Sequence, residues 1–318
     1  MEGRIVSAEP DETATILLNG TAIASIPVDE KNGQAAAEPG ARGFTFMFPE
    51  PLTAADSVAV HAKDGTLLRF GAFCDYPERL RRLFLGIDLE NQNGLEFGAL
   101  DRPLLSRKRY AVSNVDHTTR EGLAAKYKSA PASNVNIEKL YPVDFVWNGE
   151  TSLSEAVNGQ TFGFAVSSHV IEHVADPISW LGEIAAVLHP GGRLNFAVPE
   201  KTQTFDFRRT ETTPAQLLAD YEARLKIPSF AQIFDHIIYA APLGSNDPPH
   251  PSINAYTVAR HNVANRIYTD VHCHVWTVTS WNECWRVIDD LGLLPLKMEA
   301  VFEPLPGTNE FIVSLVKQ

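Results

Sequence analysis

Apolar positions between residues 160 and 201 fall into a pattern that predicts a strand, a helix and a second strand. The first apolar run covers Phe162 to Val166. Apolar residues then recur at helical spacing from Ile178 to Leu188, and Pro190-Gly191-Gly192 is expected to stop this helix. A second apolar run follows from Leu194 to Val198. Segments of this length form a right-handed βαβ unit whose two strands are buried in a parallel sheet.

The residues that follow these two strands are the first place to search for a functional site. In parallel sheets, ligands bind beyond the carboxyl ends of the strands. Here those ends carry Ser167, Ser168 and His169 after the first strand, and Pro199-Glu200-Lys201 after the second.

Further apolar runs predict the rest of the sheet and its helices. A hairpin around residues 305–307 is expected to join the last two strands. The predicted strands are Leu95–Phe97, Tyr110–Val115, Val143–Trp147, Leu296–Phe302 and Phe311–Val316. The predicted helices, apart from Ile178–Leu188, are Tyr76–Leu85, Thr213–Leu225, Ser229–Ala240, Ile253–Ile267 and Ser280–Leu291.

Residues 1–75 have a different pattern, which predicts a small β-sandwich-like accessory domain. Asn19-Gly20 separates two apolar runs, as does Lys63-Asp64-Gly65, and both are hairpin signals. Residues from Gly43 to Phe48 alternate as in a strand. We expect this segment to serve in packing, including homo-oligomer formation, in preference to sugar binding.

Composition narrows the class of protein. A chain of 318 residues with 44% hydrophobic residues can bury one large domain and a small one. The net charge of −12 argues against a nucleic-acid partner, because proteins that bind phosphate backbones usually present a basic face. No run of apolar residues is long enough for a signal core or a membrane span, so we expect a cytoplasmic protein with no membrane partner.

Two stretches, SSHVIEHVADP and VLHPGGRLNFAVPEK, resemble the motifs after the fourth and before the fifth strand of class I S-adenosylmethionine-dependent methyltransferases. The resemblance covers about Gly94 to Gln318 and is closest to a bacterial branch that occurs beside glycan-assembly enzymes. In that branch LEFGALDRP replaces the usual glycine-rich loop. The implied fold is α/β: a Rossmann-like sheet of seven mostly parallel strands in residues 76–318, with the last strand antiparallel and a helical lid inserted at about 200–270.

The resemblance implies S-adenosyl-L-methionine as cofactor. Asp116 ends the second strand, eighteen positions after Gly98, where an acidic residue can accept hydrogen bonds from both ribose hydroxyls. The alternative is that Asp116 only caps a helix beginning at Thr118. The expected cofactor-binding residues are Glu96, Gly98, Ala99, Asp116, Asp144, Phe145, Ser167, Ser168 and His169.

One position departs from the pattern of the relatives. Gly163 stands where this branch usually has an aspartate. The missing carboxylate, together with the reduced glycine loop, keeps open a second interpretation: a non-catalytic cofactor- or carbohydrate-binding protein with a degenerate methyltransferase fold. Calorimetry with S-adenosylmethionine separates the two.

The histidines of this chain allow a rival interpretation. His169, Glu172 and His173 spell H-x-x-E-H, a zinc-peptidase motif that needs both histidines on one face of a helix. Asp176-Pro177 follows so closely that two helical turns are not expected, and no metal ligand is assigned. Residues 272–274, His-Cys-His, could add ligands, and metal analysis of the purified protein would decide.

The predicted reaction is methyl transfer to a hydroxyl of a saccharide or another small molecule. A sugar hydroxyl is a weak acid, so a base is expected, and the unperturbed pKa of histidine, about 6.5, suits that role. His173 is the first choice, with helix capping as its alternative role, and Asp206 is next if no histidine serves. The expected walls of the acceptor site are His169, His173, Asp206, His236 and His274.

Overall fold

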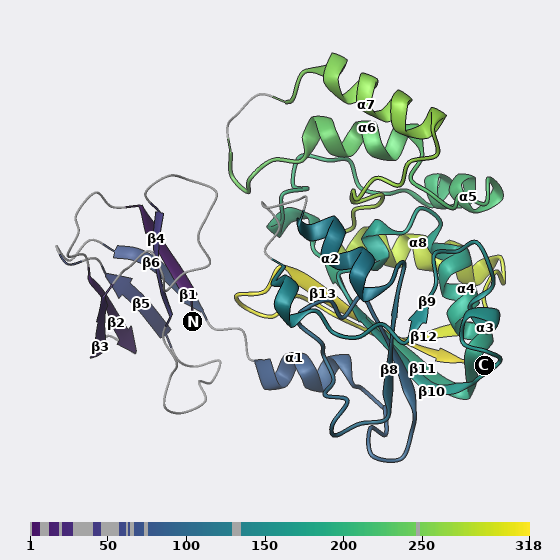
Figure 1. Cartoon of the computed structure of the whole chain (residues 1–318), viewed down its shortest axis with the longest axis horizontal. Coiled ribbons are helices and arrows are strands. Elements are labelled where there is room, and N and C mark those ends of the chain that lie inside the picture. Colours follow the sequence, from purple (N-terminus) through teal and green to yellow (C-terminus); the bar gives the residue numbers. More distant parts are fainter. Residues whose placement is uncertain are drawn as a thin grey trace. The chain divides into compact units, whose positions relative to one another are not determined.

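The chain divides into two compact units in the computed structural model (Figure 1). One unit holds Met1–Arg79 with Tyr127–Val135 and Leu305–Thr308, and the other holds Leu80–Lys126, Asn136–Pro304 and Asn309–Gln318. The structure describes residues 2–6, 13–18, 21–27, 41–45, 57–61, 63, 67–72, 76–128, 135–245 and 249–318.

The described part of the N-terminal unit consists of two antiparallel sheets. The two predicted hairpin turns lie outside the described residues, except for Lys63, but the strands on either side of each turn do pair with each other. Whether the sheets form a sandwich stays an expectation. One sheet has the order β3-β2-β5-β6, with β2 Thr13–Leu18, β3 Thr21–Pro27, β5 Ser57–His61 and β6 Leu67–Ala72, and the other pairs β1 Glu2–Val6 with β4 Ala41–Thr45.

The second unit is built on a seven-stranded sheet in the order β12-β13-β11-β10-β7-β8-β9. Strands β7 to β11 are parallel, and β13 is antiparallel to both of its neighbours, which confirms the predicted sheet. The bounds are β7 Gly94–Phe97, β8 Val112–Asp116, β9 Phe145–Val146, β10 Phe162–Ser168, β11 Leu188–Pro199, β12 Leu296–Phe302 and β13 Glu310–Lys317.

The helices follow the predicted ones closely. In α4, Pro177 occupies the first turn and Asp176 caps the helix by accepting the Ser179 N–H at 3.0 Å. The bounds are α1 Tyr76–Leu83, α2 Arg120–Lys128, α3 Leu153–Ala156, α4 Pro177–Val187, α5 Pro214–Glu222, α6 Phe230–Tyr239, α7 Ser252–Ala264 and α8 Val278–Asp290, with 3₁₀ turns η1 Ile137–Lys139, η2 Ile171–His173 and η3 Lys201–Gln203.

Two predicted strands differ in length from the observed ones. Helix α4 ends at Val187, within one residue of its predicted end, but Pro190-Gly191-Gly192 lies inside β11, which begins earlier than predicted. The pairing of β10 with β11 shifts register between Phe162 and Phe164, which absorbs the extra residues. Strand β9 is only two residues long, although the backbone N–H groups on both sides of it still bond to β8.

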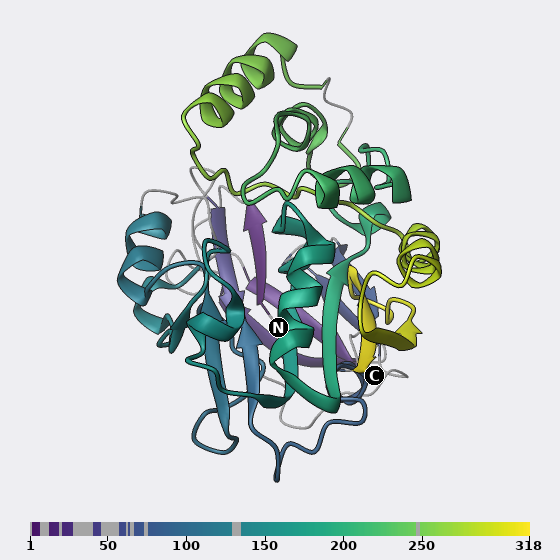
Figure 2. The ribbon, with the colours of Figure 1, turned by 90° about the vertical axis from the view of Figure 1, so that its right-hand side faces the viewer.

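Buried side chains cover both faces of the sheet. Alternate residues of β10 point to opposite faces: Ala165 packs in the cluster with α4 and α8, whereas Phe164 packs with Leu105 and Val112. On the face of the sheet that Phe164 covers, Leu83 of α1 is fully buried. In Figure 2 helices α5 to α7 lie at one end of the strands, and they follow β11 along the chain. None of the helices in the described ranges is long and apolar enough to cross a bilayer.

The side chain of Gln92 explains the glycine in β10. A Cβ added at Gly163 would lie 2.8 Å from the Gln92 side chain. Gln92 therefore fills the space into which a larger side chain at this position would project.

A chain that begins at Tyr76 should unfold cooperatively and bind S-adenosylhomocysteine, because the buried clusters around the large sheet begin with Leu83. Thermal unfolding by circular dichroism and calorimetry with S-adenosylhomocysteine measure the two properties. Loss of the cooperative transition would show that residues 1–75 belong to the same core.

Candidate active site

The loop after β7 makes a tight turn at the carboxyl edge of the sheet. Gly98 has φ +67°, a left-handed conformation that favours glycine. A Cβ at Gly98 would lie 2.7 Å from a methyl group of Val170, so this turn packs directly against the segment that follows β10. Ala99, the next residue, is buried. The loop and the His169–His173 segment therefore pack against each other at Val170.

Glu96 supports this loop from inside the protein. Its side chain is buried, and its two carboxylate oxygens accept the N–H groups of Leu104 at 2.6 Å and Leu105 at 3.1 Å. Burial raises the pKa of Glu96 to about 7, and the two N–H donors oppose this rise. Glu96 therefore fixes the shape of the loop without facing a ligand itself.

Asp116 is the last residue of β8 and has an oxygen available for a ligand. Its Oδ1 accepts the backbone N–H of His117 at 2.8 Å and lies 2.7 Å from Nδ1 of the His117 ring, whereas Oδ2 has no hydrogen-bond partner among the described residues. Helix α2 begins at Arg120, so Asp116 does not cap it and the alternative role is wrong. A carboxylate in this position, beside the turn at Gly98, fits a cofactor that carries ribose hydroxyls.

Asp144 and Phe145, both expected to bind the cofactor, have other contacts in the structure. Asp144 binds Arg107 at 2.7 Å through Oδ1 and accepts the Asn114 N–H at 2.8 Å through Oδ2. Phe145 packs edge-on against Phe162 in the core, at 6.5 Å between ring centroids. Both residues hold β9 against the sheet.

The strand end after β10 carries a strained histidine. Ser167 is fully buried, Ser168 is half-buried, and His169 has φ +56°, which is uncommon for a residue with a side chain. The Nε2 atom of His169 lies 2.8 Å from Glu310 Oε2 at the start of β13. This contact joins the ends of β10 and β13.

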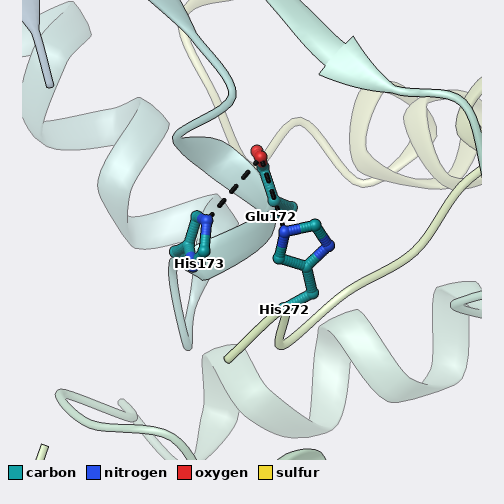
Figure 3. A group of neighbouring side chains, drawn as sticks. All are labelled: Glu172, His173 and His272. Atoms are coloured by element: carbon teal, nitrogen blue, oxygen red, sulfur yellow. Dashed lines mark ion pairs between the residues drawn. The ribbon is translucent and has the colours of Figure 1, made fainter. Parts of the chain in front are cut away.

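Glu172 lies at the centre of a histidine cluster (Figure 3). Its Oε1 is 3.9 Å from His169 Nδ1, 3.8 Å from His173 Nε2 and 4.0 Å from His272 Nε2. Its backbone carbonyl accepts the N–H groups of Cys273 and His274, which places His272 opposite η2. The sequence analysis named Glu172 and His272 in motifs but gave them no role.

His173 is paired with Asp270, which the sequence analysis did not identify. Their Nδ1 and Oδ1 atoms are 3.0 Å apart. Burial by itself would lower the pKa of His173, but Asp270 and Glu172 outweigh burial and raise it. Although burial opposes it, pairing with His173 and Lys126 holds the pKa of Asp270 well below its usual range.

Asp206 supports His272 from behind and does not line an open wall. It is buried, its Oδ2 lies 2.5 Å from His272 Nδ1, and its Oδ1 accepts from Arg209 at 2.9 Å. Burial would raise its pKa, but His272 and Arg209 lower it. His236 accepts the backbone N–H of His272 through Nδ1 at 3.2 Å. Burial lowers the pKa of His236 to about 3, and the nearby charges of Arg209 and His272 act in the same direction.

His274 lies inside the core and not in the histidine cluster around Glu172. It is 0% exposed, stacks on Trp276 at 5.3 Å between centroids, and lies 3.3 Å from the Ala175 carbonyl. Burial lowers its pKa to about 4. The thiol of Cys273 is also buried, which raises its pKa and leaves it unreactive.

Replacing Glu96 with Gln should remove a pH dependence of stability. A carboxyl whose pKa rises from 4.5 to about 7 on folding keeps its proton in the folded state, so the free energy of unfolding falls as pH rises between those values. Glu96→Gln should lack this fall, which amounts to about 3 kcal/mol. Urea unfolding can be followed by tryptophan fluorescence, since all five tryptophans lie between residues 147 and 285. Equal pH slopes for the two proteins would contradict the prediction.

Comparison with known proteins gives one family. The model of a family described as "Methyltransferase domain" matches residues 68–286. A curated ubiquinone biosynthesis O-methyltransferase from Parvibaculum lavamentivorans is 35% identical over 88 residues, which is 25% of this chain. The match spans about a third of that relative's length, 34%.

Solved structures of methyltransferases are also similar. One is an S-adenosylmethionine-dependent methyltransferase from Mesorhizobium loti, 14% identical, with coverage of 76% of this chain and 96% of that one at a TM-score of 0.39. Another is the CcbJ methyltransferase of Streptomyces caelestis, which is 11% identical. The match covers 78% of this chain and 98% of that one, with a TM-score of 0.40.

The family match covers more than half of the chain, and it confirms the class that SSHVIEHVADP and VLHPGGRLNFAVPEK predicted. The chain therefore belongs to the family described as "Methyltransferase domain".

Proposed function

We propose that this protein transfers a methyl group from S-adenosylmethionine to a hydroxyl oxygen of a saccharide or another small molecule. The observation that carries the proposal is the position of the histidine cluster. His169 and His173 lie in the segment whose Val170 packs against the turn at Gly98, and His272 lies 4.0 Å from Glu172 of the same segment. Ligands of such sheets bind at these strand ends.

The residues around the loop fit the cofactor. Asp116 Oδ2 is available to the ribose hydroxyls, Gly98 allows close approach of the backbone, and Glu96 holds the loop in shape. The bound cofactor supplies an electrophilic methyl group on a sulfonium. The protein has to hold the acceptor oxygen in line with that methyl group, exclude water and remove the hydroxyl proton.

An exposed aromatic ring next to the cluster suits a small organic acceptor. Phe205 is 40% exposed, and its ring centroid lies 4.6 Å from that of His272 and 5.9 Å from that of His236. Such a ring offers an apolar surface for the C–H face of a sugar or for another ring. The O-methyltransferase in the name of the curated relative supports an oxygen acceptor, and the resemblance to glycan-associated methyltransferases supports a saccharide.

We assign the role of base to His169 in place of His173, our first choice from the sequence. The neighbour of His169, Val170, contacts the cofactor loop at Gly98, whereas His173 faces Asp270, which precedes the return of the chain to the core. Glu310 holds the His169 ring through Nε2. In this role His169 would accept the proton that the acceptor hydroxyl loses when its oxygen takes up the methyl group.

The direct test incubates the protein with S-adenosylmethionine and a set of monosaccharides, nucleotide-sugars and phenols, and measures S-adenosylhomocysteine. We expect acceptor-dependent product. Tight binding of S-adenosylmethionine without transfer to any acceptor would instead favour the non-catalytic interpretation.

Asp116→Ala should weaken S-adenosylhomocysteine binding by about 1–3 kcal/mol, because the ribose hydroxyls lose their acceptor. Isothermal calorimetry measures the affinity. Asp289→Ala, a change at an exposed residue of α8, is the control and should bind as tightly as wild type. Unchanged affinity in Asp116→Ala would show that the ribose lies elsewhere.

His169→Gln should lower methyl transfer by about 10²–10⁴-fold, the usual effect of losing a general base, while cofactor affinity stays near wild type. His250→Gln, at an exposed histidine after α6, provides the matched control. If His169→Gln keeps wild-type turnover, His169 is not the base.

A further inference from the structure

We propose that Glu172, His173 and His272 bind one divalent transition-metal ion, with Zn²⁺ the best match to their ligand atoms. This site goes beyond the sequence analysis, which assigned no metal ligand. The three residues each offer one ligand atom, and these atoms lie within 4.8 Å of one another (Figure 3). Imidazole nitrogen and carboxylate oxygen are ligands that zinc prefers.

The spacing of the atoms fits a shared ion better than direct hydrogen bonds. Glu172 Oε1 is 3.8 Å from His173 Nε2 and 4.0 Å from His272 Nε2, which is too long for hydrogen bonds. Two atoms that each lie about 2.1 Å from one zinc ion are at most about 4.2 Å apart. Both distances fall within that limit, so small side-chain adjustments would complete the site.

Glu172 provides an independent indication that a cation is needed. The residue is 1% exposed, and neither carboxylate oxygen has a hydrogen-bond partner among the described residues. A buried carboxylate without such partners is strongly unfavourable. A bound cation would satisfy both the charge and the lone pairs of these oxygens.

Both histidines have the outer partners that metal-binding histidines require. His272 Nδ1 lies 2.5 Å from Asp206, and His173 Nδ1 lies 3.0 Å from Asp270. A carboxylate at Nδ1 fixes the proton there and leaves Nε2 as the lone-pair donor. In both rings this Nε2 is the atom directed at Glu172. Arg209 in turn orients Asp206.

The site differs from the zinc-peptidase motif that the sequence suggested. Residues 171–173 form a single 3₁₀ turn, so the two histidines of H-x-x-E-H are not on one face of an α-helix. The ligands come from η2 and from His272 just before α8, held together by the hydrogen bonds of the Glu172 carbonyl with Cys273 and His274. Glu172 is here a ligand and not a base.

Three protein ligands leave at least one position of a tetrahedral ion open. His272 also contacts the exposed ring of Phe205, so the open position is expected near the proposed acceptor site. We infer that it takes an oxygen of the acceptor, an assignment that rests on the proposed function. The metal site itself does not depend on it.

Metal binding can be measured without any methyl acceptor. Full-length protein without a histidine tag is stripped with EDTA, dialysed and titrated with ZnCl₂ in a calorimeter, and bound zinc is counted by plasma mass spectrometry. We expect one Zn²⁺ per chain. Asp270→Asn removes a residue that orients a ligand and should weaken zinc binding by about 10–100-fold. Glu172→Gln and His272→Gln each remove a ligand and should weaken zinc binding by more than that. The control His250→Gln should bind like wild type.

Each variant is also tested for its thermal midpoint and its affinity for S-adenosylhomocysteine, so that a misfolded variant is recognised and replaced by the milder Asp270→Asn. Failure of wild type to bind stoichiometric zinc, or unchanged zinc affinity in both ligand variants, overturns the site. Zinc binding without methyl transfer would leave the metal site standing and remove the proposed function. Methyl transfer at full rate in stripped, zinc-free protein would remove the inferred role of the ion at the acceptor.

Discussion

The buried carboxylate of Glu172 is the constraint around which the strand-end region is arranged. A charge in this position has to be balanced, and three imidazole rings surround it at 3.8–4.0 Å. The same residue ties distant parts of the chain together, because its carbonyl accepts the N–H groups of Cys273 and His274. The turn after β10 and the segment that re-enters the core before α8 therefore depend on one residue for both geometry and charge.

Two further carboxylates, Asp206 and Asp270, pair with the histidines that surround Glu172. Asp206 and Asp270 each face one histidine, and Arg209 and Lys126 balance them from the other side. Asp206 and Asp270 thus each have a cationic neighbour, whereas the oxygens of Glu172 have no hydrogen-bond donor in the described part of the chain. This is why a cation at Glu172 completes the pattern and does not disturb it.

The sequence was sufficient for the sheet, because apolar runs and helical spacing depend on neighbours in the chain. The positions of most strands and of Asp116 at the end of β8 followed from apolar runs and motif spacing, whereas the antiparallel β13 was implied by the resemblance to methyltransferases. The histidines were found as residues near strand ends. Their partners were not, since His272 and Asp206 are 66 residues apart, and His169 and Glu310 are 141 apart. No periodicity connects positions so far separated.

Packing also decides between roles that the sequence left open. Five histidine or aspartate positions had been placed around one acceptor, but burial divides them: His274 stacks on Trp276 inside the core, and Asp206 lies behind His272. His169 and His173 remain at the half-exposed rim, with 35% and 32% of their side chains exposed. A group can act on an acceptor only if the acceptor can reach it. The proposed chemistry is therefore confined to the rim, and we infer that Asp206 and Asp270 affect it by orienting the imidazole rings of His272 and His173.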